Sequence, residues 1–257
     1  MPDPLPEHAA AFDAAGPQDA PAIVLVHGSV VSRKIWLPQL RSLSRAHRVV
    51  APDLPGHGDL ASLPFTFAAA VETVAETIIR EAGGRALVVG LSLGGWVAIQ
   101  LAHRHPELIS GLVLVGCSRD TTGLIGVYLK AVSGLMRRGW LRQRPERLEE
   151  KTRRLFPPAL RDVADEQMRA GIHAEPLAPA FAEMAGRKWS ALLAELPAPL
   201  LIVNGERDSM ARKGEAVFLA AAPDARAVTI AGAGHACNLD QPEAFDRALL
   251  EFAGVGR

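Results

Sequence analysis

A serine between glycines is the residue of this sequence best suited to chemistry. Ser92 lies in Gly90-Leu91-Ser92-Leu93-Gly94, after an apolar run at 86–89 and before a helical pattern. A strand that turns sharply into a helix exposes the hydroxyl and aims free N–H groups and the positive end of the helix dipole at it. With a base beside it, such a serine is a nucleophile for acyl transfer. We therefore expect a nucleophile elbow at Ser92.

Two further residues complete a candidate catalytic set. His235, the candidate base, follows the run Ala-Gly-Ala-Gly between a predicted strand and the last predicted helix. Asp208 comes soon after the predicted strand at 200–203, where a carboxylate would orient the imidazole and stabilise the imidazolium. Each residue follows its own strand, so all three should meet at the carboxyl edge of one sheet. The sequence thus predicts a triad of Ser92, Asp208 and His235.

The choice of acid has an alternative. Asp120 also follows a predicted strand, at 112–115, and Asp208 has the simpler interpretation of a solvated turn carboxylate. An Asp208→Asn variant separates them, because retained activity would favour Asp120.

An oxyanion formed at Ser92 needs two N–H donors. The backbone N–H of Leu93 is one, and the second is expected from the loop after the predicted strand at 22–26, with Ser29 preferred and Val30 as the alternative. One such donor typically contributes about 2.7 to 4 kcal/mol to lowering the barrier. His27 in the same loop is expected to support it by hydrogen bonding rather than to transfer protons.

The positions of these residues depend on a regular alternation of strands and helices. Apolar runs without polar alternation indicate strands buried on both faces, at 22–26, 48–51, 86–89, 112–115, 200–203 and 227–230, with a weaker one at 9–14. Helical patterns lie between them, at 36–44, 67–81, 93–103, 214–221 and 243–252. This alternation predicts an α/β fold with a doubly wound, mostly parallel sheet.

The alternation stops between 116 and 200, where the chain is helical and basic. We expect residues 118–197 to be an inserted helical cap, because a structureless loop of this length is uncommon in a compact domain. Residues 1–117 and 198–257 would then form the α/β core.

Composition excludes several classes of partner. The 28 basic and 28 acidic residues cancel, so no overall charge attracts nucleic acid or an anionic membrane. No signal-peptide pattern or long apolar span is visible, and two cysteines, Cys117 and Cys237, suit a reducing compartment. We expect a cytoplasmic protein. Without clustered metal-binding side chains or a glycine-rich phosphate loop, the sequence implies no metal and no cofactor.

Five segments together resemble a known family. They are HGSVVSRKIW, APDLPGHGDL, VVGLSLGGWVAIQLAHRHPE, LLIVNGERD and AGAGHACNLDQPEAF, and they resemble signatures of the capped α/β-hydrolase superfamily, of the esterase, lactonase and carbon–carbon hydrolase type. The resemblance implies that His57 shapes the rim of the site. Members with an aspartate nucleophile, such as epoxide hydrolases and haloalkane dehalogenases, are disfavoured because Ser92 occupies the elbow.

The predicted cap should determine which substrate enters. Candidate pocket residues are Val30, Trp36, Leu124, Tyr128 and Trp140. Residues 119–169 hold twelve basic and seven acidic side chains, and one arginine, Arg119 or Arg137, is a candidate for binding a substrate carboxylate.

These observations favour a serine hydrolase that cleaves a small or medium carboxylic ester or lactone through an acyl-enzyme. Alternatives on the same scaffold are a carbon–carbon bond hydrolase of dienoic ketones and a cofactor-free haloperoxidase or perhydrolase. Outside enzymes, the alternative is a capped receptor for a small molecule. The oligomeric state stays open.

Overall fold

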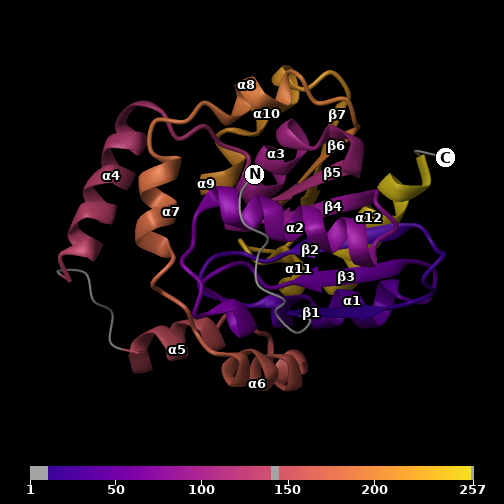
Figure 1. Ribbon diagram of the computed structural model, residues 1–257, viewed down its shortest axis with the longest axis horizontal. Coiled ribbons are helices and arrows are strands. Elements are labelled where there is room, and N and C mark those ends of the chain that lie inside the picture. Colours follow the sequence, from indigo (N-terminus) through magenta and orange to yellow (C-terminus); the bar gives the residue numbers. More distant parts are fainter. Residues whose placement is uncertain (1–10, 140–144, 256–257) are drawn as a thin grey trace.

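The computed structural model describes residues 11–139 and 145–255, and within them seven strands form one sheet (Figure 1). The strands are β1 (Phe12–Ala15), β2 (Ala22–Val26), β3 (Arg48–Pro52), β4 (Ala86–Leu91), β5 (Ile109–Val115), β6 (Leu200–Gly205) and β7 (Ala225–Ile230). Their order is β1-β3-β2-β4-β5-β6-β7, and all neighbours are parallel except β1, which runs antiparallel to β3. The order reverses between β2 and β4, where sheets of this kind bind ligands.

Both faces of the sheet are buried. In β2, Val24 and Val26 pack into one hydrophobic cluster, whereas Ile23 and Leu25 pack into the other. Successive side chains of a strand point to opposite faces, so a sheet covered on both sides needs apolar residues throughout. This explains why the strand sequences are continuous apolar runs.

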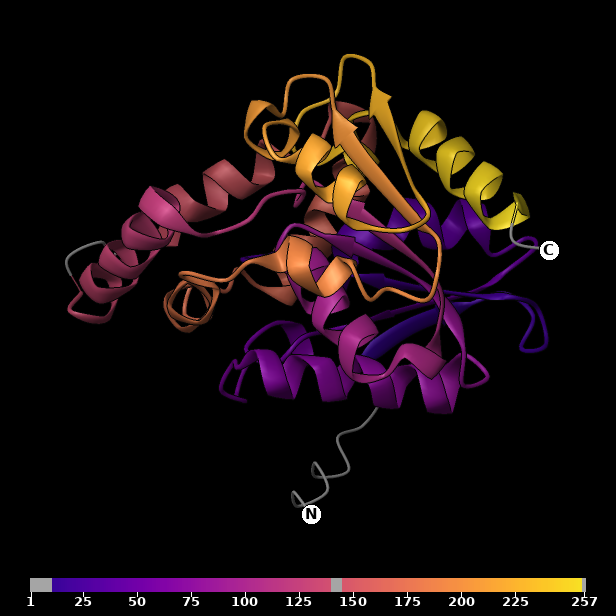
Figure 2. The ribbon, with the colours of Figure 1, turned by 90° about the horizontal axis from the view of Figure 1, so that it is seen from above.

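Helices form a layer on each side of the sheet, as Figure 2 shows. One layer contains α1 (Leu37–Leu43) and α12 (Pro242–Val255), and the other contains α2 (Phe67–Glu81), α3 (Leu93–Arg104) and α10 (Glu215–Ala221). Short helical turns connect the elements: η1 (Arg33–Trp36), η2 (Gly58–Leu60), η3 (Pro106–Leu108), η4 (Pro158–Leu160), α9 (Ser209–Arg212) and α11 (Cys237–Asp240).

Local sequence signals explain where these helices begin. The hydroxyl of Thr66 accepts a hydrogen bond from the N–H of Ala69 at 3.0 Å and so caps α2. Proline is the first residue of α12, at Pro242, and the second residue of α1, at Pro38, positions whose N–H groups lack an intrahelical partner in any case.

The segment between β5 and β6 is helical. It contains α4 (Gly123–Arg137), α5 (Pro145–Arg153), α6 (Arg161–Ala170), α7 (Leu177–Met184) and α8 (Trp189–Leu193). Figure 1 shows α4 and α7 side by side away from the sheet, and the hydroxyl of Ser133 on α4 donates to the carbonyl of Ala178 on α7 at 2.7 Å. By contrast α8 packs with the sheet-covering helices, because Trp189 is fully buried against Trp96 of α3.

The fold class predicted from the sequence is confirmed, and so are the predicted strands and helices outside the β5–β6 segment. The weak first strand, predicted at 9–14, is present as β1, although residues 9 and 10 lie outside the described part of the chain. Across the described residues, none of the helices combines the length and apolar character needed to cross a bilayer.

Candidate active site

Ser92 lies in a tight turn between β4 and α3. Its φ of +52° is unusual for a residue with a side chain, and its N–H donates to the carbonyl of Val115 on the neighbouring strand at 2.8 Å. A Cβ on Gly94 would lie only 2.4 Å from the carbonyl oxygen of Val26, so glycine is required where α3 meets β2. The helix begins at Leu93, whose N–H has no carbonyl one turn earlier in the helix to bind.

His235 and Asp208 are joined by a short hydrogen bond. The distance between His235 Nδ1 and Asp208 Oδ2 is 2.6 Å, and Asp208 Oδ1 accepts from the N–H of Ala211 at 3.1 Å. Burial by itself would raise the pKa of Asp208, but the hydrogen bonds from His235 and Ala211 outweigh it and hold the pKa below the usual value. The carboxylate is therefore ionised at neutral pH and keeps Nδ1 protonated, which leaves Nε2 as the nitrogen able to accept a proton.

Ser92 and His235 line the same pocket, which has a volume of about 260 Å³. Within the described residues no hydrogen bond joins Ser92 Oγ to the imidazole. Hydrogen bonds between catalytic groups are often long without substrate and tighten in the complex. The other lining residues are Gly28, Ser29, Val30, Val31, Ile35, Leu91, Leu148, Lys151, Thr152, Leu155 and Ala236.

Part of this pocket is formed by the loop at residues 27–32, here named the β2 loop. Ser29 and Val30 both line the pocket beside Ser92. Apart from Ser92, Val30 is the one non-glycine residue with a positive φ in the described chain, at +74°. Such a conformation costs about 1 to 3 kcal/mol and persists only when its surroundings hold it.

His27 supports the β2 loop by hydrogen bonding, as expected from the sequence. Its Nε2 accepts from the N–H of Leu54 at 3.0 Å, and its Nδ1 lies 2.7 Å from the carbonyl oxygen of Gly28, to which it donates. Burial lowers the pKa of His27 to about 4, so the ring is neutral at pH 7. A neutral ring bonded at both nitrogens has no nitrogen left for proton transfer.

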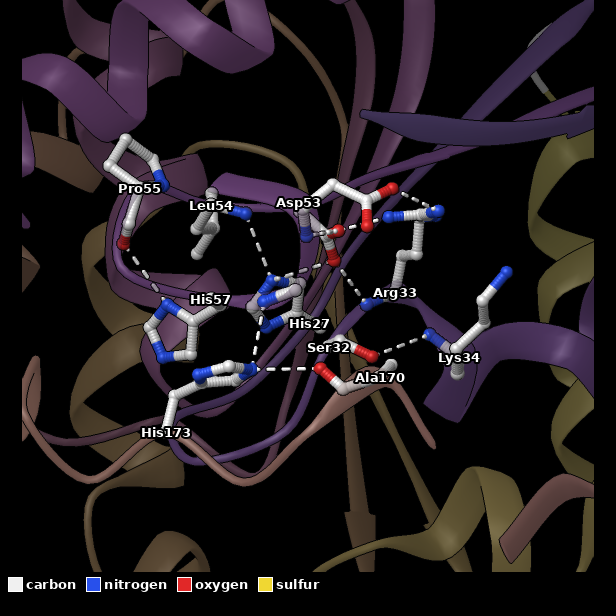
Figure 3. Close-up of polar contacts among 12 residues, drawn as sticks. His27, Ser32, Arg33, Lys34, Asp53, Leu54, Pro55, His57, Ala170 and His173 are labelled. Carbon is white, nitrogen blue, oxygen red and sulfur yellow. Dashed lines mark hydrogen bonds and ion pairs between the residues drawn. The ribbon is translucent and has the colours of Figure 1, made fainter. Parts of the chain in front are cut away.

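Two more histidines, His57 and His173, form a row of rings with His27 (Figure 3). The His57 ring contacts both His27 and His173 edge to face, and its Nδ1 donates to the carbonyl of Pro55 at 3.1 Å. Burial lowers the pKa of His57 to about 3. His173 comes from the β5–β6 segment, and its Nε2 accepts from the N–H of Gly58 at 3.0 Å. The three histidines therefore connect that segment to the core beside the β2 loop.

An ion-pair network fixes the end of the β2 loop, and Figure 3 shows part of it. The N–H of Arg33 donates to Asp53 at 2.9 Å, and its guanidinium also binds the Asp53 carboxylate. The same guanidinium binds Asp13 at 3.0 Å and Asp59 at 2.7 Å. Sequence reasoning missed this network, and the available signal was an arginine directly after the β2 loop together with an aspartate, Asp53, directly after β3.

The structure corrects most of the predicted pocket. Val30 lines it, but Trp36 is fully buried and packs against Phe245 in the core. Leu124 and Tyr128 lie on the outer face of α4, 88% and 64% exposed, because the opposite face of this helix packs on α7. Trp140 lies outside the described residues.

The alternative acid is engaged elsewhere. Both carboxylate oxygens of Asp120 bind Ser190, accepting from its N–H at 2.8 Å and its hydroxyl at 2.7 Å. The two candidate arginines also lie outside the pocket lining, with Arg119 extending towards the sulfur of Met210 and Arg137 ending α4.

Sequence reasoning missed the residues that α5 brings to the pocket, which are Leu148, Lys151 and Thr152. No motif marks them, and the only signal was the helical spacing of three and four residues that places them on one face. Within residues 11–139 and 145–255 no group of three or more His, Cys, Asp or Glu side chains is arranged to hold a metal ion.

Known proteins resemble this chain over most of its length. The Alpha/beta hydrolase family matches residues 23–248. The pimeloyl-(acyl-carrier protein) methyl ester esterase of Aromatoleum aromaticum is 30% identical over 253 residues, covering 90% of this chain and 96% of that protein. A hydrolase structure from Pseudomonas aeruginosa PA01 matches with a TM-score of 0.77 and 29% identity, over 95% of this chain and 93% of the other. A malate-bound esterase structure from Thermogutta terrifontis matches with a TM-score of 0.76 and 25% identity, over 96% of this chain and 93% of the other.

Proposed function

This chain belongs to the alpha/beta hydrolase family, and on that premise we propose that it is a serine hydrolase that cleaves a small or medium carboxylic ester or lactone. The observation that carries the proposal is the shared pocket of Ser92 and His235, with His235 bonded to Asp208 at 2.6 Å. The pocket also has an apolar lining suited to an acyl chain.

In the proposed reaction the hydroxyl of Ser92 attacks the ester carbonyl while Nε2 of His235 takes its proton. Asp208 stabilises the imidazolium that results. The tetrahedral intermediate collapses, His235 donates the proton to the departing alkoxide, and an acyl-Ser92 ester remains. Water then attacks this ester with His235 again as the base, which releases the carboxylic acid and restores Ser92.

We propose that the oxyanion of both intermediates binds the N–H groups of Leu93 and Ser29. Leu93 is favoured because it is the first residue of α3, and Ser29 because it lines the pocket beside Ser92. The strained backbone of Val30 next to Ser29 supports this assignment, since strain of this kind clusters where a loop must present its backbone to a ligand.

Residues 118–197 are proposed to act as the cap. The support for this role is α5, which supplies three of the residues lining the pocket opposite the core. The named relative acts on a methyl ester, so methyl esters of acyl groups are the first substrates to test. That name also favours ester cleavage over the carbon–carbon hydrolysis that the sequence left open.

Labelling with a fluorophosphonate tests the proposal. The wild-type protein should form one adduct, located by peptide mass spectrometry at Ser92. Ser92→Ala should form none and should lose ester turnover while it still binds substrate. The matched control is Ser62→Ala, an exposed loop serine, which should label as the wild type does. Absence of an adduct on folded wild-type protein would contradict the enzyme assignment and favour a receptor.

A further inference from the structure

The pocket beside Ser92 has an uneven distribution of charge. Its lining is mainly apolar, and among the described residues that line it the one ionisable side chain apart from His235 is Lys151 of α5. Lys151 is a solvent-exposed residue that also lines the pocket, so the site carries a cation that binding of a neutral acyl chain would not require.

Lys151 differs from the basic residues that follow it. Arg153 binds Asp165 at 2.9 Å and Glu149 at 3.5 Å, and Arg154 binds Glu150. In the described part of the chain no carboxylate lies within ion-pair distance of Lys151. Its charge is therefore available to a ligand.

The neighbouring residue adds a hydrogen-bond donor. Thr152 is buried and also lines the pocket, and its hydroxyl has no partner among the described residues. The ammonium and the hydroxyl of two adjacent residues that line one pocket are both donors suited to an oxyanion.

We propose that Lys151 and Thr152 bind a carboxylate on the substrate, so that the preferred substrates are esters with a free carboxylate separated from the ester by an apolar chain. This inference rests on the proposed ester hydrolysis at Ser92. A single cation matches a single negative charge, which favours a carboxylate over a phosphate dianion. The apolar residues between Ser92 and α5 suit the connecting methylenes. Lys151 thus takes the role that the sequence analysis gave to Arg119 or Arg137.

Matched pairs of esters test the proposal. One member is the monomethyl ester of an α,ω-dicarboxylic acid, and the other is the methyl ester of a monocarboxylic acid of the same chain length, over a graded series. The wild-type protein should favour the anionic member at an optimal length. In Lys151→Met, the ratio of the anionic to the neutral kcat/KM should fall about five- to tenfold, mainly through KM. Lys151→Arg should keep most of the preference, and added salt should weaken it.

Arg154→Met is the matched control, because Arg154 lies on the same part of the chain, is paired with Glu150 and does not line the pocket. Its ratio should equal that of the wild type. An equal kcat/KM for both members in the wild type, or an unchanged ratio in Lys151→Met, would overturn the inference.

Calorimetry in the Ser92→Ala background separates this inference from the proposed function. Lys151-dependent binding of the monomethyl ester, together with no turnover by the wild type, would support the carboxylate site and contradict the hydrolase. Turnover of neutral esters by the wild type, without Lys151-dependent binding of the monomethyl ester, would support the hydrolase and contradict the carboxylate site.

Discussion

The backbone N–H of His173 donates to the carbonyl oxygen of Val30 at 2.9 Å, across an antiparallel bridge between the β5–β6 segment and the β2 loop. Val30 has a φ of +74°, which its surroundings must maintain. The His173 ring adds a second connection, to the N–H of Gly58. The segment proposed as the cap therefore holds the loop proposed to bind the oxyanion.

Loss of the His173 ring should loosen the β2 loop indirectly, because the ring's bond to the N–H of Gly58 anchors the residue whose backbone N–H binds Val30. We expect His173→Ala to lower kcat about tenfold with a smaller change in KM, because a displaced oxyanion donor weakens transition-state binding more than substrate binding. Steady-state kinetics with a neutral ester measure this. His103→Ala, at an exposed histidine outside the pocket, is the control and should behave as the wild type. A rise in KM alone would contradict a positioning role.

The acid of the triad can be identified by exchange for an amide. Asp208→Asn should reduce kcat about 10³- to 10⁴-fold, because the amide no longer holds the imidazole tautomer or stabilises the imidazolium. Asp120→Asn should retain kcat, since Asp120 bonds to Ser190 instead. The comparison requires equal folding, checked by circular dichroism. High activity of Asp208→Asn would transfer the role to Asp120.

Stability should depend on pH through the buried histidines. His27 and His57 have folded-state pKa values of about 4 and about 3, below the ordinary 6.5. The unfolded chain therefore binds more protons, and stability is complete above pH 6.5 and is lost as the pH falls through that value. For each of these two histidines, the free energy of unfolding should be about 2 kcal/mol lower at pH 5 than at pH 7. Urea unfolding at the two pH values measures this difference.

His57→Phe should remove one of the two contributions, so that its loss of stability between pH 7 and pH 5 is about 2 kcal/mol smaller than that of the wild type. His103→Phe changes an exposed histidine and should leave the pH dependence as it is. An identical pH dependence in His57→Phe and the wild type would show that His57 is not held neutral by burial.

The buried charge of Asp53 should require its partner. Arg33→Met leaves a fully buried carboxylate without its cation and should cost about 3 to 5 kcal/mol in the free energy of unfolding. Arg33→Met combined with Asp53→Asn should recover part of this loss. The control is Arg41→Met, which breaks the exposed pair with Asp162 and should cost less than about 1 kcal/mol. Urea midpoints of the four proteins give the comparison.

Glycine at position 94 should be indispensable. The Cβ of Gly94→Ala would lie 2.4 Å from the Val26 carbonyl oxygen, so α3 must move away from β2. This movement would also displace Ser92, which directly precedes α3. We expect a loss of stability of several kcal/mol and of fluorophosphonate labelling. Gly254→Ala, where a Cβ meets no atom within 4 Å, should change neither. A stable, labelled Gly94→Ala protein would contradict the packing of the elbow.

Much of this protein was accessible from the sequence because its signals are local. Buried parallel strands appear as continuous apolar runs, and the carboxyl ends of parallel strands share one edge of the sheet. The strands, the core helices and the fold class followed from these rules. Ser92, Asp208 and His235 could be named because each follows a strand, and their joint role as a triad stays a prediction.

The β5–β6 segment was decided only by tertiary packing. The sequence of α4 is apolar on several sides, so periodicity could not show that Leu124 and Tyr128 face outwards while the other side packs on α7. Likewise, nothing local to α5 indicates that Lys151 reaches the pocket of Ser92. The sequence determined the elements and named the candidate residues at the sheet edge. The pocket beside them depended on contacts between distant segments, because a helix encodes its own apolar face but not the surface that this face will meet.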